Sequence, residues 1–307
     1  MVGNLSEQYY VRNSEKSMKV MIIGADGQLG SDLVRVFSEK TDWHLIPLTI
    51  QDLDITNVEK SKWTIQTYHP DVIVNTAGYI QVDLCETHVE QAFQVNAFAQ
   101  KHMSEFCRTS QIKYCLFSTD YVFDGKKTIP YKESDPPRPM SMYGVSKLAG
   151  EQIVQYMMEQ YLIVRVSGLY GTTSPIGKKG NFIEMILERA KKDETLRVVD
   201  DQILTPTFTL DVANQMVTLL SSDETGIFHM TNQGSCSWYD FASQILKKCG
   251  LQNEILRAKT GDFRELAHRP SFSVLENDRL SRLNMDEMAE WQCALHRYLI
   301  LKGHCVE

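Results

Sequence analysis

The sequence predicts an α/β protein built on a doubly wound parallel sheet, a Rossmann-like fold, with a smaller and irregular α/β C-terminal substrate domain. Short apolar runs alternate with longer stretches whose apolar residues recur at helical spacing, a pattern typical of βαβ units. A glycine-rich loop at 24–30 joins the first apolar run to the first helical stretch. In a parallel sheet, this turn commonly binds a phosphate-bearing ligand.

Five strands are expected in the first two-thirds of the chain, each a run of apolar residues that a sheet covered on both faces would bury. They lie at 20–23, 44–49, 71–75, 114–118 and 161–166. Helices are expected between them at 28–40, 89–106 and 143–159. Because each helix is long enough for a crossover, the strands should run parallel.

The alternation loosens beyond Gly171. A loop rich in Gly, Ser, Thr and Lys at 172–180 is a candidate substrate lid. A helix at 181–192, a strand at 196–199 and a helix at 238–249 are expected to follow. We therefore divide the chain into a leader or tag-like extension (1–17), a dinucleotide-binding Rossmann domain (18–170) and a mainly substrate-binding domain (171–307) from which some segments return to the sheet.

Composition narrows the class of protein. The 307 residues are 43% hydrophobic and carry a formal net charge of -7, which argues against a nucleic-acid surface. No window approaches the roughly 18 apolar residues of a membrane span. The seven cysteines are scattered and form no C-x-x-C pair, which favours reduced thiols and a cytoplasmic location. No group of His, Cys, Asp or Glu has metal-ligand spacing, so we expect no metal site.

The glycine-rich loop has the spacing G-x-x-G-x-x-G, with Gly24, Gly27 and Gly30 flanking Gln28 and Leu29. Glycines permit a tight turn and let a pyrophosphate approach the helix N-terminus, where amide groups and the helix dipole favour negative charge. The alternative is an ordinary strand-to-helix turn. Its place between the first strand and the first helix favours a dinucleotide site.

The end of the second strand commonly decides between NAD and NADP, because an acid there bonds the ribose 2′-hydroxyl and repels a 2′-phosphate. The residues at 48–51 include neither an acid nor an arginine. Asp52 and Asp54 follow, and Asp54 with Ile55 is expected to flank the adenine. This pattern favours NADPH and keeps NADH as an alternative.

Tyr143 and Lys147 are four residues apart, so on a helix they share one face. We expect the ammonium to lower the pKa of the tyrosine from its usual value near 10, as a general acid requires. Thr119, at the end of the fourth strand, could donate a hydrogen bond to a substrate carbonyl, or act only as a strand residue or helix cap. Together they predict a centre that protonates a carbonyl oxygen during hydride transfer.

Several residues allow a purely structural interpretation. Asn96 either bonds backbone near the fourth strand or sits exposed on its helix. Asp120 could form a turn, and Tyr121 could be a core aromatic. His229 lies in an apolar run and is expected to be a core histidine, while Trp238 is expected to anchor a helix.

The motifs resemble those of the extended short-chain dehydrogenase/reductases, and within them the dTDP-4-dehydrorhamnose reductases. The resemblance runs from Met18 to at least Leu275. It rests on the motifs at 24–30, 53–56, 70–75, 118–125, 143–151, 201–202, 206–207, 237–239 and 269–270.

The resemblance implies that NAD(P)H reduces the 4-keto group of a nucleotide-activated 6-deoxyhexulose. It implies Tyr143 as proton donor, Lys147 as its tuning group and the holder of the nicotinamide ribose, and Thr119 as an aid at the carbonyl. The cofactor-lining positions would be Gly24, Gly27, Gln28, Leu29, Gly30, Asp54, Ile55, Ala77, Gly78, Tyr79 and Asn96. The sugar-side positions would be Thr119, Asp120, Tyr121, Val82, Gly168, Asn181 and Phe182.

Two departures from the family pattern concern the sugar. Gly168 stands where the family usually has tryptophan, which should enlarge the pocket, and the segment 77–83 also differs. The alternatives are therefore a reductase of another nucleotide-linked keto sugar, and a non-catalytic NADP-binding regulatory subunit like the β-subunit of methionine adenosyltransferase. The expected partner is a nucleotide-sugar substrate. The sequence is also compatible with a homodimer.

Overall fold

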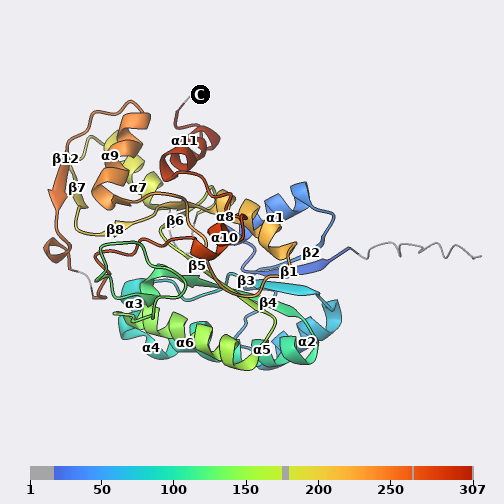
Figure 1. Ribbon diagram of the computed structural model, residues 1–307. Coiled ribbons are helices and arrows are strands. Elements are labelled where there is room, and N and C mark those ends of the chain that lie inside the picture. The colour runs from blue at the N-terminus through green and yellow to red at the C-terminus, as the bar shows by residue number, and fades with distance from the viewer. Residues whose placement is uncertain (1–16, 175–179, 265, 306–307) are drawn as a thin grey trace, which may run out of the picture.

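The computed structural model describes residues 17–174, 180–264 and 266–305. Its centre is a parallel sheet of six strands in the order β10-β5-β4-β3-β1-β2, which confirms the predicted doubly wound α/β fold (Figure 1). The strands are β1 (Lys19–Ile23), β2 (His44–Leu48), β3 (Val72–Asn75), β4 (Lys113–Thr119), β5 (Tyr161–Val166) and β10 (Gly226–His229).

The five strands expected in the first two-thirds of the chain are all present, with ends within about one residue of those predicted. The sixth strand, β10, comes from beyond residue 170 and pairs in parallel with β5. Alternate residues of a strand face opposite sides of the sheet. In β1, for example, Val20 and Ile22 enter one core, while Met21 and Ile23 enter another.

Two layers of helices cover the sheet (Figure 1). The first core packs α1 (Gln28–Lys40) and α8 (Thr209–Leu220) against one face. The second core packs α2 (Val58–Tyr68), α5 (Ala99–Thr109) and α6 (Met142–Met157) against the other. The residues of both cores are almost fully buried, so the carboxyl ends of the strands are held rigidly.

The helix predicted over 89–106 is interrupted, which corrects the prediction. The chain forms α4 (Val89–Phe93), a π-helical turn η1 (Gln94–Phe98) and then α5. The backbone of η1 lies directly against α6, because a Cβ built on Gly150 would be 2.1 Å from the Asn96 carbonyl oxygen. A π-turn is a local widening that often marks a functional site, and this one brings Asn96 into the interior.

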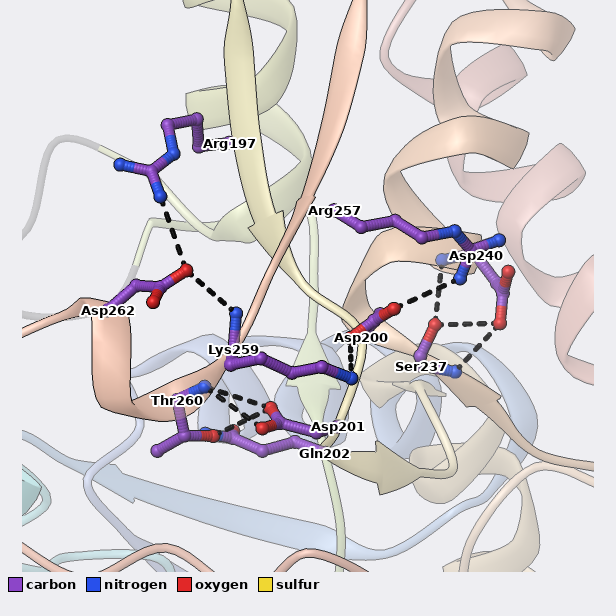
Figure 2. A network of polar contacts seen from close by, with 10 residues as sticks. All are labelled: Arg197, Asp200, Asp201, Gln202, Ser237, Asp240, Arg257, Lys259, Thr260 and Asp262. Atoms are coloured by element: carbon purple, nitrogen blue, oxygen red, sulfur yellow. Dashed lines mark hydrogen bonds and ion pairs between the residues drawn. The ribbon is translucent and has the colours of Figure 1, made fainter.

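The C-terminal lobe has its own core, made by three helices around a parallel pair of strands (Figure 1). These are α7 (Phe182–Lys191), α9 (Trp238–Lys248), α11 (Trp291–Leu301), β7 (Leu196–Val199) and β12 (Ile255–Ala258). Trp238 is partly buried against this core and contacts Phe182 at 4.6 Å between ring centroids. At the ends of β7 and β12, exposed acids and bases form a polar network (Figure 2).

Short elements connect these parts. They are α3 (Val82–Thr87), η2 (Asp120–Val122), β6 (Leu169–Tyr170), β8 (Ile203–Leu204), β9 (Thr207–Phe208), β11 (Cys236–Ser237), η3 (Thr260–Asp262) and α10 (Asp278–Arg282). Residues 1–16 of the predicted leader, and 175–179 of the predicted lid, lie outside the described residues. The division of the chain into domains stays a prediction.

Candidate active site

The glycine-rich loop forms the turn between β1 and α1. Gly24 has a φ of +80°, and the amides of Gly24 and Ala25 donate to the Leu48 carbonyl at 2.9 and 3.0 Å. A Cβ on Gly30 would lie 2.0 Å from the Gly24 oxygen, so only glycine allows the helix to pack this closely. The first turn of α1 carries no acid in the sequence, and Gly27 caps it without a side chain. This end of a long helix suits an anion.

Gln28 and Leu29 have different places in this loop. Leu29 is buried in the core beneath the loop, and Gln28 Nε2 donates to the Leu169 carbonyl at 3.1 Å. Gln28 Oε1 is buried and has no hydrogen-bond partner among the residues that the structure describes. A buried oxygen without a partner can accept a hydrogen bond from a bound ligand, and the hydroxyls of a nucleotide could donate one.

Asp52 and Asp54 lie in the loop that follows β2. The Asp52 carboxylate accepts hydrogen bonds from the Thr49 amide and hydroxyl at 2.9 and 2.8 Å, which lower its pKa. Asp54 is exposed, and its carboxylate accepts from Thr56 at 2.9 and 2.7 Å. Ile55 is buried in the core. The adenine-flanking role of Asp54 and Ile55 stays a prediction.

Asn96 orders the loop after β3. Its Oδ1 accepts from the Tyr79 amide at 2.9 Å, and its Nδ2 donates to the Tyr79 carbonyl and to Ser146 Oγ, each at 3.0 Å. Asn96 therefore does bond backbone, at the loop after β3 instead of the predicted fourth strand, and it is buried. The loop residues Ala77 and Gly78 are partly exposed, and a Cβ on Gly78 would be 3.8 Å from Lys147 Nζ.

Helix α6 presents Tyr143 and Lys147 toward the end of β4. The helix starts at Ser141, whose hydroxyl accepts from the Gly144 amide at 3.2 Å. Lys147 is 6% exposed, and its Nζ donates to the Phe117 carbonyl at 2.6 Å. Burial lowers the pKa of Lys147 to about 8, against a smaller opposite effect of Glu151. The ammonium is thus fixed between β4 and the Gly78 loop.

The phenol of Tyr143 lies beside the Thr119 hydroxyl, with which it shares a hydrogen bond. Burial raises the pKa of Tyr143 well above its usual value. The hydrogen bond with Thr119 opposes this rise, and the charge of Asp120 adds a smaller increase. The expectation that Lys147 lowers this pKa is wrong for this structure, because burial dominates and Lys147 is bonded to Phe117. At neutral pH the phenol is therefore protonated.

Asp120 and Tyr121 lie next to this pair. Asp120 is 4% exposed and accepts from Thr119 Oγ1 at 3.1 Å and from Ser167 Oγ at 2.9 Å. Burial raises the pKa of Asp120 to about 6, although hydrogen bonds from Ser273, Ser167 and Thr119 oppose the rise. The Tyr121 ring meets Tyr143 edge to face at 5.6 Å.

The immediate surroundings of Gly168 are crowded. Its φ is +54°, and a Cβ there would be 2.7 Å from Leu204 Cδ1 and 3.0 Å from the Thr205 carbonyl oxygen. Leu204 thus occupies the position toward which a side chain would point. A larger residue here would strain both the backbone and its neighbours, and the expected enlargement of the pocket stays a prediction.

The remaining sugar-side positions lie in two places. Val82 begins α3 and is partly buried. Asn181 caps α7 through bonds from Ile183 and Glu184, and its Nδ2 donates to the Gly171 carbonyl and to Tyr298, each at 3.0 Å. Its hydrogen-bonding groups are thus already used within the lobe. Phe182 stacks on Phe241 at 5.7 Å. The substrate roles of these residues stay predictions.

Sequence reasoning missed Ser167 and Ser273, which reach Asp120 from beyond β5 and from the C-terminal segment. Ser167 follows a predicted strand, a signal that could have marked it. Ser273 has no such signal, because it is placed only by the pairing of its amide with the Ile203 carbonyl at 2.8 Å. The same segment helps to line a pocket of about 630 Å³ with the loop after β4.

His229 behaves as expected of a core histidine: it is fully buried, and its Nδ1 lies 3.1 Å from the carbonyl oxygens of Tyr131 and Glu276. Over the described ranges, no group of three or more His, Cys, Asp or Glu side chains could hold a metal ion. In the same part of the chain, no helix is long and apolar enough to cross a membrane.

Comparison with known proteins identifies the family. The family model described as the RmlD substrate binding domain matches residues 18–302. The spore coat polysaccharide biosynthesis protein SpsK of Bacillus subtilis is 35% identical over 281 residues, covering 92% of this chain and 96% of that protein.

Two solved structures agree. A dTDP-4-dehydrorhamnose reductase of Clostridium acetobutylicum has a TM-score of 0.89 and 36% identity, covering 93% of this chain and 100% of that one. The dTDP-4-dehydrorhamnose reductase of Bacillus anthracis, solved in complex with NADP, has a TM-score of 0.88 and 33% identity over the same shares. The chain therefore belongs to the dTDP-4-dehydrorhamnose reductase family of the extended short-chain dehydrogenase/reductases.

Proposed function

We propose that this protein is an NADPH-dependent oxidoreductase that reduces the 4-keto group of a nucleotide-activated 6-deoxyhexulose. The best single candidate is dTDP-4-dehydrorhamnose, which would give dTDP-L-rhamnose. The observation that carries the proposal is a protonated phenol, Tyr143, held against Thr119 at the end of β4. A buried ammonium, Lys147, lies one helical turn away. This is the donor set that carbonyl reduction requires.

The residues around the glycine-rich loop fit a dinucleotide. The uncapped first turn of α1 would take the pyrophosphate, and the unpartnered Gln28 Oε1 would accept from a hydroxyl. Asn96 holds the loop at 77–79, which borders the Lys147 ammonium. The relative solved with NADP supports NADPH. When bound, the cofactor supplies a hydride to the carbonyl carbon of the substrate.

Tyr143 would act as the general acid. Its raised pKa keeps the phenol protonated at neutral pH, so a proton is available when negative charge develops on the carbonyl oxygen. Lys147 is cationic below about pH 8 and would stabilise the phenolate that remains.

The identity of the sugar is the finer part of the proposal. The relatives of comparable similarity include SpsK and a dTDP-4-dehydrorhamnose reductase. Gly168, with Leu204 against it, is one of the two places at which this chain departs from the family pattern beside the predicted sugar site. A different nucleotide-linked keto sugar is accordingly the second candidate substrate.

The test is a panel of 4-keto nucleotide sugars, in which oxidation of NADPH or NADH is followed by absorbance. Both cofactors are included because the exposed Asp52 carboxylate lies in the loop that follows β2. We expect turnover with dTDP-4-dehydrorhamnose and the largest kcat/KM with NADPH. Turnover with another sugar only would correct the substrate. Absence of turnover with every sugar, together with tight binding to a partner enzyme, would favour a regulatory subunit and overturn the proposal.

A further inference from the structure

The Thr119 hydroxyl has three neighbours and one proton. Its oxygen accepts from the Tyr121 amide at 3.2 Å and lies 3.1 Å from Asp120 Oδ1. An ionised carboxylate can only accept, so the Thr119 proton must point at Asp120. The third neighbour is the phenol of Tyr143, which must then be the donor in the bond between the two hydroxyls.

Asp120 is itself held from two other parts of the chain. Ser167, just after β5, donates to Oδ2 at 2.9 Å, and the Ser273 hydroxyl also bonds the carboxylate. All three side chains are at most 4% exposed. Both carboxylate oxygens are therefore engaged by the protein's own hydroxyls. This arrangement gives Asp120 a role different from the predicted contact with the sugar.

We propose that Asp120 is a positioning residue for the proposed reduction. It accepts the Thr119 proton and thereby fixes Thr119 as the acceptor of the Tyr143 proton. Its negative charge lies behind the Thr119 hydroxyl. The phenol then stays protonated until the substrate oxygen takes its proton. In the reaction the Tyr143 O–H bond breaks as an O–H bond forms on the sugar, while the hydride from the nicotinamide forms the C–H bond. The sugar is reduced by two electrons and the nicotinamide is oxidised. The inference rests on the proposed function.

The groups that face Tyr143 determine how its protonation responds to pH. Asp120 from η2 and Cys85 from α3 are the ionisable groups whose charge would raise the pKa of Tyr143. Burial raises the pKa of the Cys85 thiol to about 11, so this group is neutral at pH 7. Lys147, on the same helix, is bonded to the Phe117 carbonyl. Asp120 faces the hydroxyls of Thr119, Ser167 and Ser273.

The first test is the pH profile of Asp120→Asn. Loss of the charge, and freedom of Thr119 to donate to Tyr143, both stabilise the phenolate, so the alkaline limb of kcat should move to lower pH. We expect kcat to fall by about tenfold or more, while KM for the sugar stays within about twofold. A raised KM with an unchanged alkaline limb would show that Asp120 contacts the sugar and would overturn the inference.

A matched control is Asp32→Asn. Asp32 is also a buried aspartate with a pKa raised by burial, and its carboxylate accepts from Thr209 at 2.5 Å. It lies on α1, outside the Thr119 cluster, so its variant should keep the wild-type kcat and pH profile. Ser167→Ala, which removes one donor to Asp120, should shift the profile by less than Asp120→Asn. An unshifted profile in Asp120→Asn with an altered one in Asp32→Asn would contradict the inference.

A second readout does not need turnover. The protein is labelled with ¹³C in the tyrosine rings. The Cζ resonance of Tyr143 is assigned as the one that is missing from the spectrum of Tyr143→Phe. It should begin to titrate at lower pH in Asp120→Asn than in wild type, and equal titration in both would overturn the inference. If no keto sugar is reduced, the proposed function fails while this measurement still decides the role of Asp120.

Discussion

At the carboxyl end of β4 the ionisable side chains are buried, whereas at the ends of β7 and β12 they lie largely on the surface (Figure 2). In the surface network Asp200 pairs with Lys259 at 2.8 Å and with Arg257 at 3.3 Å. The hydrogen bond between them lowers the pKa of Asp200 and raises that of Lys259. In the buried site the shifts have the opposite sign, since burial raises the pKa of Asp120 and lowers that of Lys147.

The difference separates the proposed catalytic cluster from the surface network. Paired surface charges stabilise each other's ionised forms and are screened by solvent, so they contribute little. Buried groups held away from a counter-charge have pKa values near working pH, where a proton can be exchanged. The sign of the shift thus distinguishes the two clusters, although both are rich in acids, lysines and hydroxyls.

The largest expected effect is on catalysis at the buried site. Tyr143→Phe removes the proton donor and keeps the ring, so kcat should fall by roughly 10² to 10⁴. Cofactor affinity should change by less than about twofold, because the ring still fills its place. Steady-state assays and fluorescence titration with NADPH measure the two quantities. Preserved turnover would remove Tyr143 from the mechanism.

The next effect concerns the stability of the packing between α6 and β5, next to the site. Glu151 and Arg165 form a buried ion pair at 2.6 Å, with exposed fractions of 0% and 2%. Glu151→Ala leaves a buried guanidinium without its carboxylate, and the free energy of unfolding should fall by about 3–5 kcal/mol. The double variant Glu151→Leu/Arg165→Met should recover most of this loss in a denaturant titration. A double variant no better than the single one would mean that packing, not charge, dominates.

Asp120→Asn should stabilise the fold while it impairs the reaction. A folded-state pKa raised from 3.8 to about 6 corresponds to an order of 3 kcal/mol by which ionised Asp120 destabilises the fold at pH 7. Because the folded protein binds the proton more tightly, wild-type stability rises as pH falls from about 6 toward 4. The gain of the variant in Tm should therefore be largest at pH 7–8 and fade near pH 4. An equal gain at every pH would contradict the assigned protonation.

The smallest effect is expected in the surface network. Asp200→Ala removes the partner of Arg257 and Lys259, which both remain in contact with water. Its Tm should not differ resolvably from that of wild type, and any difference should shrink further in high salt. Its turnover should also be unchanged. A loss comparable to that of Glu151→Ala would show that the two networks are not different in kind.

Much of this fold could be predicted from the sequence because apolar periodicity marks buried strands and helices directly. The limits of α1 and β5 agree with those predicted. The π-turn at 94–98 could not be predicted, since it depends on the close approach of α6 at Gly150. Local pattern carries no information about such a long-range contact.

The site was partly predictable for the same reason. Thr119 is at the end of a predicted strand, and Tyr143 and Lys147 lie on a predicted helix. The structure brings the three residues together. The pKa of Tyr143 was predicted in the wrong direction, because the spacing of two residues on a helix does not show how deeply the phenol is buried. Ser273 and the crowding at Gly168 depend on segments that only the tertiary fold brings near.

The most direct test follows deuterium from [4-²H]NADPH of the transferring configuration, with dTDP-4-dehydrorhamnose as the acceptor. If Tyr143 protonates a carbonyl that is reduced by hydride, the sugar product should carry one deuterium at C4. One NADP⁺ should form per sugar. Formation of both products should be lost in Tyr143→Phe. Sugar turnover without net NADP⁺ formation, or a product that lacks deuterium at C4, would contradict this mechanism.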